Sequence, residues 1–193
     1  MSTAPIGKPA TYEEILALPP DLTGQIVDGE LHVSPRPANS HATASSTLGM
    51  DIGSAYQRGR GGPGGWWIVF EPEIHLGRDI VVPDLAGWRR SRLPAIPPEP
   101  FFTLAPDWIC EILSPSTASF DRVKKMRVFA REQVGHAWLV DPIARTLEVY
   151  EQGEGRWILL SAHEGTETVR VAPFAEIDLV LPDLWVEGAG ATP

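Results

Sequence analysis

The feature that most restricts the fold is the apolar stretch DWICEIL, residues 107–113. Successive side chains of a β-strand point to opposite faces of the sheet, and here both alternating sets are apolar except at Glu111. The pattern therefore predicts a strand that is buried on both sides. Glu111 is the carboxylate whose burial would cost most in this chain, because an unpaired charge inside a protein costs several kcal/mol.

Glu111 has two interpretations at this point. In the first, it is a structural residue whose charge is neutralised by a buried arginine. In the second, it is a metal ligand or a general acid or base, roles in which a perturbed carboxylate is useful. The strand alone does not decide between them.

A second carboxylate, Asp84, lies in the apolar stretch VVPDLAGW, residues 81–88. By itself, Asp84 after Pro83 is typical of a turn. However, the stretch is the strand that we expect to precede residues 107–113 in the sheet. Two carboxylates on neighbouring strands, each at the edge of an apolar run, would suit a hard divalent cation such as Mg²⁺. The pair is stronger evidence for such a site than either residue alone.

Capping, turn and periodicity patterns divide the chain into short elements. Thr11 and Glu14 form a capping-box pattern for a short helix, and Asp28-Gly29 indicates a hairpin turn in QIVDGELHVSP. The other expected elements are helices at 39–56 and 121–134, loops at 58–65 and 89–106, and strands at 66–76 (broken near residue 72), 79–88, 107–113, 136–142, 146–152, 156–161 and 167–173. Together they predict an α+β fold with a mixed central sheet and additional hairpin strands.

The helix expected at residues 121–134 places two lysines differently. Helical spacing predicts a buried stripe of Val123, Met126, Ala130 and Val134, with Phe129 at its edge. The opposite, solvated or phosphate-facing side would carry Lys124, Arg127 and Arg131. Lys125 lies one turn before Phe129, on the other flank of the stripe, so we expect Lys125 to reach over the sheet and Lys124 to face solvent.

Length and composition favour one globular domain at residues 1–187, followed by a disordered tail at 188–193. A single cysteine excludes an internal disulfide, and neither a signal-peptide pattern nor an apolar run of membrane-spanning length is present. We therefore expect a soluble, cytoplasmic protein without a membrane partner. The net charge of −9 argues against broad, sequence-blind binding to nucleic acid, although a local basic patch can oppose an acidic whole.

Several motifs in a fixed order carry a family resemblance. VPDLAGW, DWICEILSPST, DRVKKMRVFA and HAWLVDP, with DGEL in the first hairpin, resemble the Uma-type family of putative restriction endonucleases. That family is placed in the PD-(D/E)XK nuclease superfamily, and the resemblance extends from about Tyr12 to Trp185. It implies a restriction-endonuclease-like fold and metal-dependent hydrolysis of phosphodiester bonds in nucleic acid, most readily DNA. The oligomeric state is open, with a homodimer among the options.

By this resemblance, Asp84 and Glu111 would ligate Mg²⁺ or Mn²⁺ together with the carbonyl of Ile112. One position departs from the superfamily pattern. The lysine that usually lies two residues after the acidic residue is replaced here by Leu113. In the Uma-type family a lysine of the next helix takes its place, and Lys125 matches that pattern. The expected catalytic residues are thus Asp84, Glu111 and Lys125.

Other residues are candidates of lower rank. Glu30 of DGEL could lie near the metal or face solvent as a hairpin residue, and His41 is more simply a solvated residue at the start of its helix. Glu73 shares a strand face with Glu71 and His75, which a polar outward face explains. Arginines in the two loops could contact backbone phosphates or be ordinary loop charge; they are Arg58, Arg60, Arg89, Arg90 and Arg92.

Two rival functions stay open. The first is a nuclease fold that has lost catalysis and acts as a binding or assembly module, which Leu113 and the acidic net charge favour. The second is a hydrolase that uses Asp84 and Glu111 as an acid/base pair, as glycosidases do. Sugar sites usually present aromatic platforms, whereas most tryptophans here fall at core-like strand positions.

Overall fold

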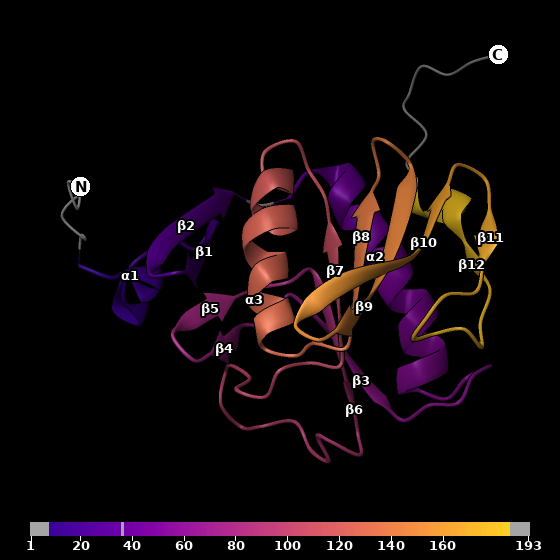
Figure 1. The fold of residues 1–193 in the computed structure, drawn as a ribbon, viewed down its shortest axis with the longest axis horizontal. Helices are drawn as coiled ribbons and strands as arrows, with labels where there is room; N and C mark the ends of the chain where they lie inside the picture. The colour runs from indigo at the N-terminus through magenta and orange to yellow at the C-terminus, as the bar shows by residue number, and fades with distance from the viewer. Residues whose placement is uncertain (1–7, 36, 186–193) are drawn as a thin grey trace.

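A computed structural model describes residues 8–35 and 37–185 and is built around a six-stranded sheet with the strand order β10-β9-β8-β7-β6-β3 (Figure 1). The strands are β3 (Trp66–Phe70), β6 (Leu85–Arg89), β7 (Trp108–Ile112), β8 (His136–Asp141), β9 (Thr146–Gly153) and β10 (Arg156–Glu164). β7 and β8 run parallel, and the other neighbouring pairs run antiparallel. The sheet is therefore mixed, as the sequence predicts.

The two faces of this sheet are covered by different helices. α2 (Asn39–Ile52), continued by the π-helical turn η1 (Gly53–Gln57), packs on one face, and α3 (Met126–Arg131) packs on the other (Figure 1). Alternate residues of β7 enter the two hydrophobic clusters, with Cys110 on the α2 side and Ile109 on the α3 side. The expectation that β7 is buried on both sides is therefore confirmed.

A second, four-stranded sheet lies beside the first, with the order β2-β1-β5-β4. Its elements are β1 (Leu22–Val27), β2 (Glu30–Pro35), β4 (Ile74–Leu76) and β5 (Asp79–Val81), and the short helix α1 (Tyr12–Leu16) precedes them. The hairpin turn at Asp28-Gly29 and the capping box of α1 form as predicted. In Figure 1 the hairpin of β1 and β2 and helix α1 project to one side of the central sheet.

The prediction of a single strand at residues 79–88 is wrong in one respect, because the segment is divided into two strands that belong to different sheets. β5 pairs with β1 and β4, whereas β6 pairs with β3 and β7. The break falls at Pro83, which has no backbone N–H and so cannot donate to a sheet ladder. As a consequence, Asp84 lies at the junction of the two sheets.

The helix expected at residues 121–134 also differs from the α-helical projection. Its first part is the π-helix η2 (Phe120–Lys125), and α3 ends at Arg131. A π-helical turn contains more residues than an α-helical one and shifts the buried face. Val123, expected in the buried stripe, is 52% exposed, whereas Phe129, expected at its edge, is fully buried.

The remaining described elements pack on the same face of the central sheet as α2. They are β11 (Thr168–Val169), β12 (Leu179–Val180) and the 3₁₀-helix η3 (Leu181–Leu184). β12 and η3 are absent from the sequence prediction, and Leu181 and Leu184 are buried in the cluster that contains α2. The tail expected at residues 188–193 lies outside the described residues. Among the described residues, no helix combines the length and the apolar character needed to cross a membrane.

The buried carboxylate of Asp79 joins the smaller sheet to α3 through Arg131. Removing Arg131 gives the first prediction. The Asp79 side chain is 1% exposed; it accepts a hydrogen bond from the Asp28 N–H at 2.7 Å and is paired with Arg131. Arg131→Ala should lower the free energy of unfolding by about 1–3 kcal/mol, a range that allows for the partial exposure of the arginine.

Urea denaturation measures this effect, with Arg127→Ala as the control, because Arg127 is an exposed arginine on the same helix. The control should change the unfolding free energy by less than about 0.5 kcal/mol. Equal effects of the two substitutions would contradict a stabilising role of the Asp79–Arg131 pair.

Candidate functional site

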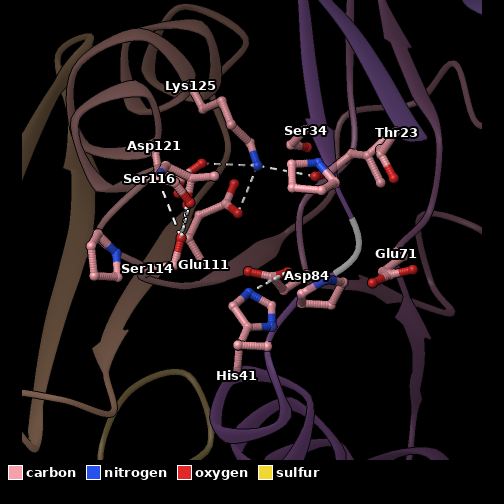
Figure 2. A pocket seen from close by; sticks show the side chains of 16 residues that line it. Thr23, Ser34, His41, Glu71, Asp84, Glu111, Ser114, Ser116, Asp121 and Lys125 are labelled. Carbon is pink, nitrogen blue, oxygen red and sulfur yellow. Dashed lines mark hydrogen bonds and ion pairs between the residues drawn. The ribbon is translucent and has the colours of Figure 1, made fainter. Parts of the chain in front are cut away.

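A cavity of about 340 Å³ lies where the two sheets meet. The first turn of α2, the junction between β5 and β6, the end of β7 and the segment 114–125 each contribute to its wall. Figure 2 shows the polar side chains that point into it. The charged and titratable residues among them are His41, Glu71, Asp84, Glu111, Asp121 and Lys125. Asp84 and Glu111, the two carboxylates singled out in the sequence, therefore line the same cavity.

Each carboxylate oxygen of Asp84 makes a contact that holds the side chain in place. The pairing of Leu85 with Cys110 across β6 and β7 brings Asp84 beside Glu111. The Ile112 N–H donates a hydrogen bond to Asp84 Oδ2 at 2.6 Å, and His41 Nε2 lies 3.1 Å from Asp84 Oδ1. These contacts orient the carboxylate from two sides and leave its remaining lone pairs for other ligands.

Glu111 is the most deeply buried carboxylate of the cavity, with 1% of its side chain exposed. Burial raises the pKa of Glu111 well above its usual value, and although the Lys125 ammonium opposes this change, the nearby Asp121 and Asp84 add to it. Glu111 Oε2 accepts a hydrogen bond from Lys125 Nζ at 2.7 Å. Within the described part of the chain, Glu111 Oε1 is buried without a hydrogen-bond partner. This oxygen is available to a ligand.

Lys125 reaches the cavity from η2, and its ammonium group contacts three oxygens. Nζ lies 2.7 Å from Glu111 Oε2, 3.0 Å from the Val82 carbonyl and 3.4 Å from Asp121 Oδ1 (Figure 2). Burial lowers the pKa of Lys125, but Glu111 and Asp121 outweigh that effect and raise it above the usual value. Lys125 is therefore protonated at neutral pH.

The neighbouring lysine lies elsewhere. Lys124 Nζ is bound to Glu30 Oε2 at 2.7 Å; the Lys124 side chain is half-buried and that of Glu30 is exposed. The structure thus separates the two lysines in the way that the helical projection predicts. Glu30 faces solvent on the hairpin, so the alternative that places it near a metal finds no support in its position.

The carboxylates of the cavity are the groups that could hold a hard divalent cation. Three buried or half-buried carboxylates, those of Asp84, Glu111 and Asp121, face one ammonium group, so the wall carries an excess of negative charge. Glu111 Oε1, buried and without a hydrogen-bond partner among the described residues, is the oxygen best placed to ligate a cation. In the described residues, no three His, Cys, Asp or Glu side chains are grouped as a metal site. A cation would therefore depend on two carboxylates, a backbone carbonyl such as that of Ile112, and water or substrate oxygens, as is common for Mg²⁺.

The cavity contains residues that the sequence pattern ranks low or does not indicate. The expectation that His41 is a solvated cap residue is wrong, because His41 is 9% exposed and contacts Asp84. Glu71 lines the cavity, whereas Glu73 lies outside it and pairs with His75 at 2.7 Å. Asp121 is not among the candidates of the sequence, although its spacing of four residues from Lys125 is that of a helical ion pair and could indicate it.

The backbone explains why Glu71 was missed. Glu71 follows the end of β3 with a φ of 43°, and its N–H donates to the Asp84 carbonyl at 3.0 Å. A positive φ breaks the alternation of the strand, so its side chain does not continue the face that it would share with Glu73 and His75 in a regular strand. The local sequence carries no glycine or asparagine that would signal this conformation.

The loop arginines do not line the cavity. Arg89 ends β6, whereas Asp84 precedes it, so the two residues lie at opposite ends of the same strand. The Arg90 guanidinium stacks over the Trp67 ring at 4.0 Å, and Arg92 pairs with Asp107 at 3.0 Å. These arginines therefore form no part of the cavity wall.

Comparisons with known proteins agree with one another. The profile of the Uma2 family, described as "Putative restriction endonuclease", matches residues 10–182. A solved structure described as a putative nuclease belonging to DUF820 from Anabaena variabilis is similar to this chain, with 27% sequence identity and a TM-score of 0.74. The match covers 92% of this chain and 98% of that one. No curated protein gives a significant match.

Proposed function

The chain belongs to the Uma2 family of putative restriction endonucleases and has a restriction-endonuclease-like fold, and from this premise we propose that it is a metal-dependent endonuclease that hydrolyses DNA. In this proposal Asp84, Glu111 and the Ile112 carbonyl hold one Mg²⁺ or Mn²⁺ ion, and Lys125 is the catalytic cation. Nuclease character follows from the family, whereas the metal, the choice of DNA and these residue roles are the proposal.

The observation that carries the proposal is the position of Lys125. The superfamily pattern requires a lysine next to the acidic residue of β7, and this chain has Leu113 at the usual position, 2% exposed in the core. Lys125 comes from the following helix, yet its Nζ lies 2.7 Å from Glu111. The ammonium group thus lies close to the carboxylates, although it comes from η2 and not from β7. This geometry supports catalysis over a fold that has lost it.

The residues of the cavity suggest how the reaction would proceed. A divalent cation at this site would supply Lewis-acid activation of the phosphodiester and of the attacking water. Asp84 would be kept in a fixed orientation by the Ile112 N–H and His41. Lys125, protonated and held by Glu111 and Asp121, would stabilise the negative charge that develops on the phosphoryl oxygens. Because the ammonium is already oriented, little reorganisation would be needed in the transition state.

The test is cleavage of closed circular plasmid DNA by the purified protein. We expect nicked and linear products with Mg²⁺ or Mn²⁺ and no products with EDTA. Asp84→Asn, purified in parallel, should be inactive, which excludes a contaminating nuclease. A circular single-stranded RNA in the same assay compares RNA with DNA as substrate.

Two outcomes would contradict the proposal. Equal cleavage by wild type and Asp84→Asn would assign the activity to a contaminant or to another site. A folded wild-type protein that cuts neither substrate with either metal would favour the catalytically inactive module.

A further inference from the structure

Two arginine-containing loops that are distant in the sequence meet at one end of the six-stranded sheet. The Arg90 N–H donates to the Gly65 carbonyl at 2.9 Å, and the Arg90 guanidinium donates to the Gln57 carbonyl at 3.0 Å. The loops together form what we call the arginine patch, which consists of Arg58, Arg60, Arg89, Arg90 and Arg92. All five residues are exposed.

We propose that the arginine patch is a second contact surface for nucleic acid, which binds backbone phosphates several nucleotides away from the bond that is cut. The inference rests on the proposed nuclease function and adds to it the region that supplies the affinity. It concerns a surface at the far end of β6, separate from the cavity.

The electrostatics of the molecule favour this assignment. The cavity wall carries an excess of negative charge, so without a cation it repels a phosphate. The whole chain has a net charge of −9, whereas the arginine patch contains five of its 16 lysines and arginines, of which Arg92 is paired with Asp107. Affinity for a polyanion must therefore come from outside the cavity. Guanidinium groups bind phosphate oxygens in a bidentate manner, which suits this role.

The loops are built to present these side chains. Arg90 stacks over Trp67 and donates to the Trp66 carbonyl at 3.2 Å, which anchors the second loop, and the Arg89 guanidinium lies 5.1 Å from the centre of the Trp66 ring. In the first loop, Gly59 has a φ of 66°, so the backbone turns sharply between Arg58 and Arg60. No bulky side chain stands between the two arginines.

The distance from the cavity predicts how long a substrate must be. β6 has five residues between Asp84 and the end of Arg89, which corresponds to about 17 Å at the usual rise per residue. Along a DNA duplex this distance covers about five base pairs. A duplex that ends closer than this to the cleavage point cannot reach the arginine patch and should bind more weakly than a longer one.

The experiment measures binding of DNA duplexes in EDTA, where no metal-dependent cleavage occurs, as a function of duplex length and salt. The test variant is Arg58→Ala/Arg60→Ala, and the matched control is Arg156→Ala/Arg170→Ala, which removes the same charge from exposed positions on β10 and after β11. For a duplex of about 24 base pairs, the log–log salt slope of the test variant should fall by about 2. The control should keep the wild-type slope and the wild-type gain in affinity from about 6 to about 24 base pairs.

The possible outcomes separate this inference from the proposed function. Suppose that the wild type cuts plasmid DNA while the test variant keeps the wild-type salt slope and length dependence of binding. This result would overturn the role of the arginine patch in binding and leave the nuclease proposal standing. Equal losses in the test and control variants would mean that only overall charge matters, which also overturns it. A wild-type protein that neither binds nor cuts nucleic acid would overturn both.

Discussion

Glu111→Gln is expected to lower the rate of Mg²⁺-dependent DNA cleavage by at least about a hundredfold while the protein stays folded. The substitution removes the charge of the carboxylate whose free oxygen, Oε1, is available to a cation. The fold should persist because Lys125 keeps Asp121 and the Val82 carbonyl as partners. Burial raises the pKa of Glu111, so a neutral amide at this position also avoids the cost of a buried charge.

Thermal melts with and without Mg²⁺ distinguish the metal-site role from a structural one. Mg²⁺ should raise the melting temperature of the wild type and leave that of Glu111→Gln nearly unchanged, because a ligand stabilises only the state that binds it. Glu73→Gln is the matched control, since Glu73 pairs with His75 outside the cavity and its substitution should preserve cleavage. A Glu111→Gln protein that melts much lower than wild type in both conditions would show that Glu111 is structural.

Lys125→Met is expected to destabilise the protein by about 3–5 kcal/mol at neutral pH. The side chain of Lys125 is 3% exposed, and it supplies the positive charge between the buried carboxylates of Glu111 and Asp121. Methionine has a similar length but no charge, so both carboxylates would be left without this partner. The matched control is Lys124→Met, which breaks only an exposed pair with Glu30 and should cost no more than about 1 kcal/mol.

The loss of folding stability caused by Lys125→Met should depend on pH in a defined direction. Burial already raises the pKa of Glu111 and Lys125 opposes that change, so removing Lys125 raises this pKa further. A group with a raised pKa in the folded state favours folding below its unfolded pKa, and that contribution disappears as pH rises through the folded value. The deficit should therefore shrink toward the ordinary Glu pKa of 4.5 and grow toward neutral and alkaline pH. Melting temperatures of both proteins across this range test it, and a deficit that grows toward acid pH would contradict the assignment.

The sequence indicated the core of the candidate site because its residues conflict with their surroundings. Glu111 interrupts a strand that is apolar on both faces, and Asp84 interrupts another. Burial of such carboxylates is costly, so local pattern alone points to them. Lys125 could be separated from Lys124 because two adjacent helical residues point in different directions.

The other residues of the cavity could not be found in this way. His41 and Glu71 are ordinary polar residues in their own segments, and only the packing of α2 and the end of β3 against Asp84 brings them to the cavity. The projection of the helix at residues 121–134 was also wrong in its first turn. It assumed α-helical spacing, and the π-helical turn η2 rotated Val123 out to solvent.

By itself, the sequence determined the α+β class, the double burial of β7 and the two carboxylates that such strands tolerate only with a partner. These properties follow from side-chain chemistry and from the two-residue and 3.6-residue periods of strands and helices, which act locally. The tertiary structure alone decided that the chain switches sheets at Pro83, that His41 and Glu71 reach the cavity of Asp84, and that the loops of the arginine patch meet at the far end of β6. Each of these depends on contacts between segments distant along the chain, which no local pattern encodes.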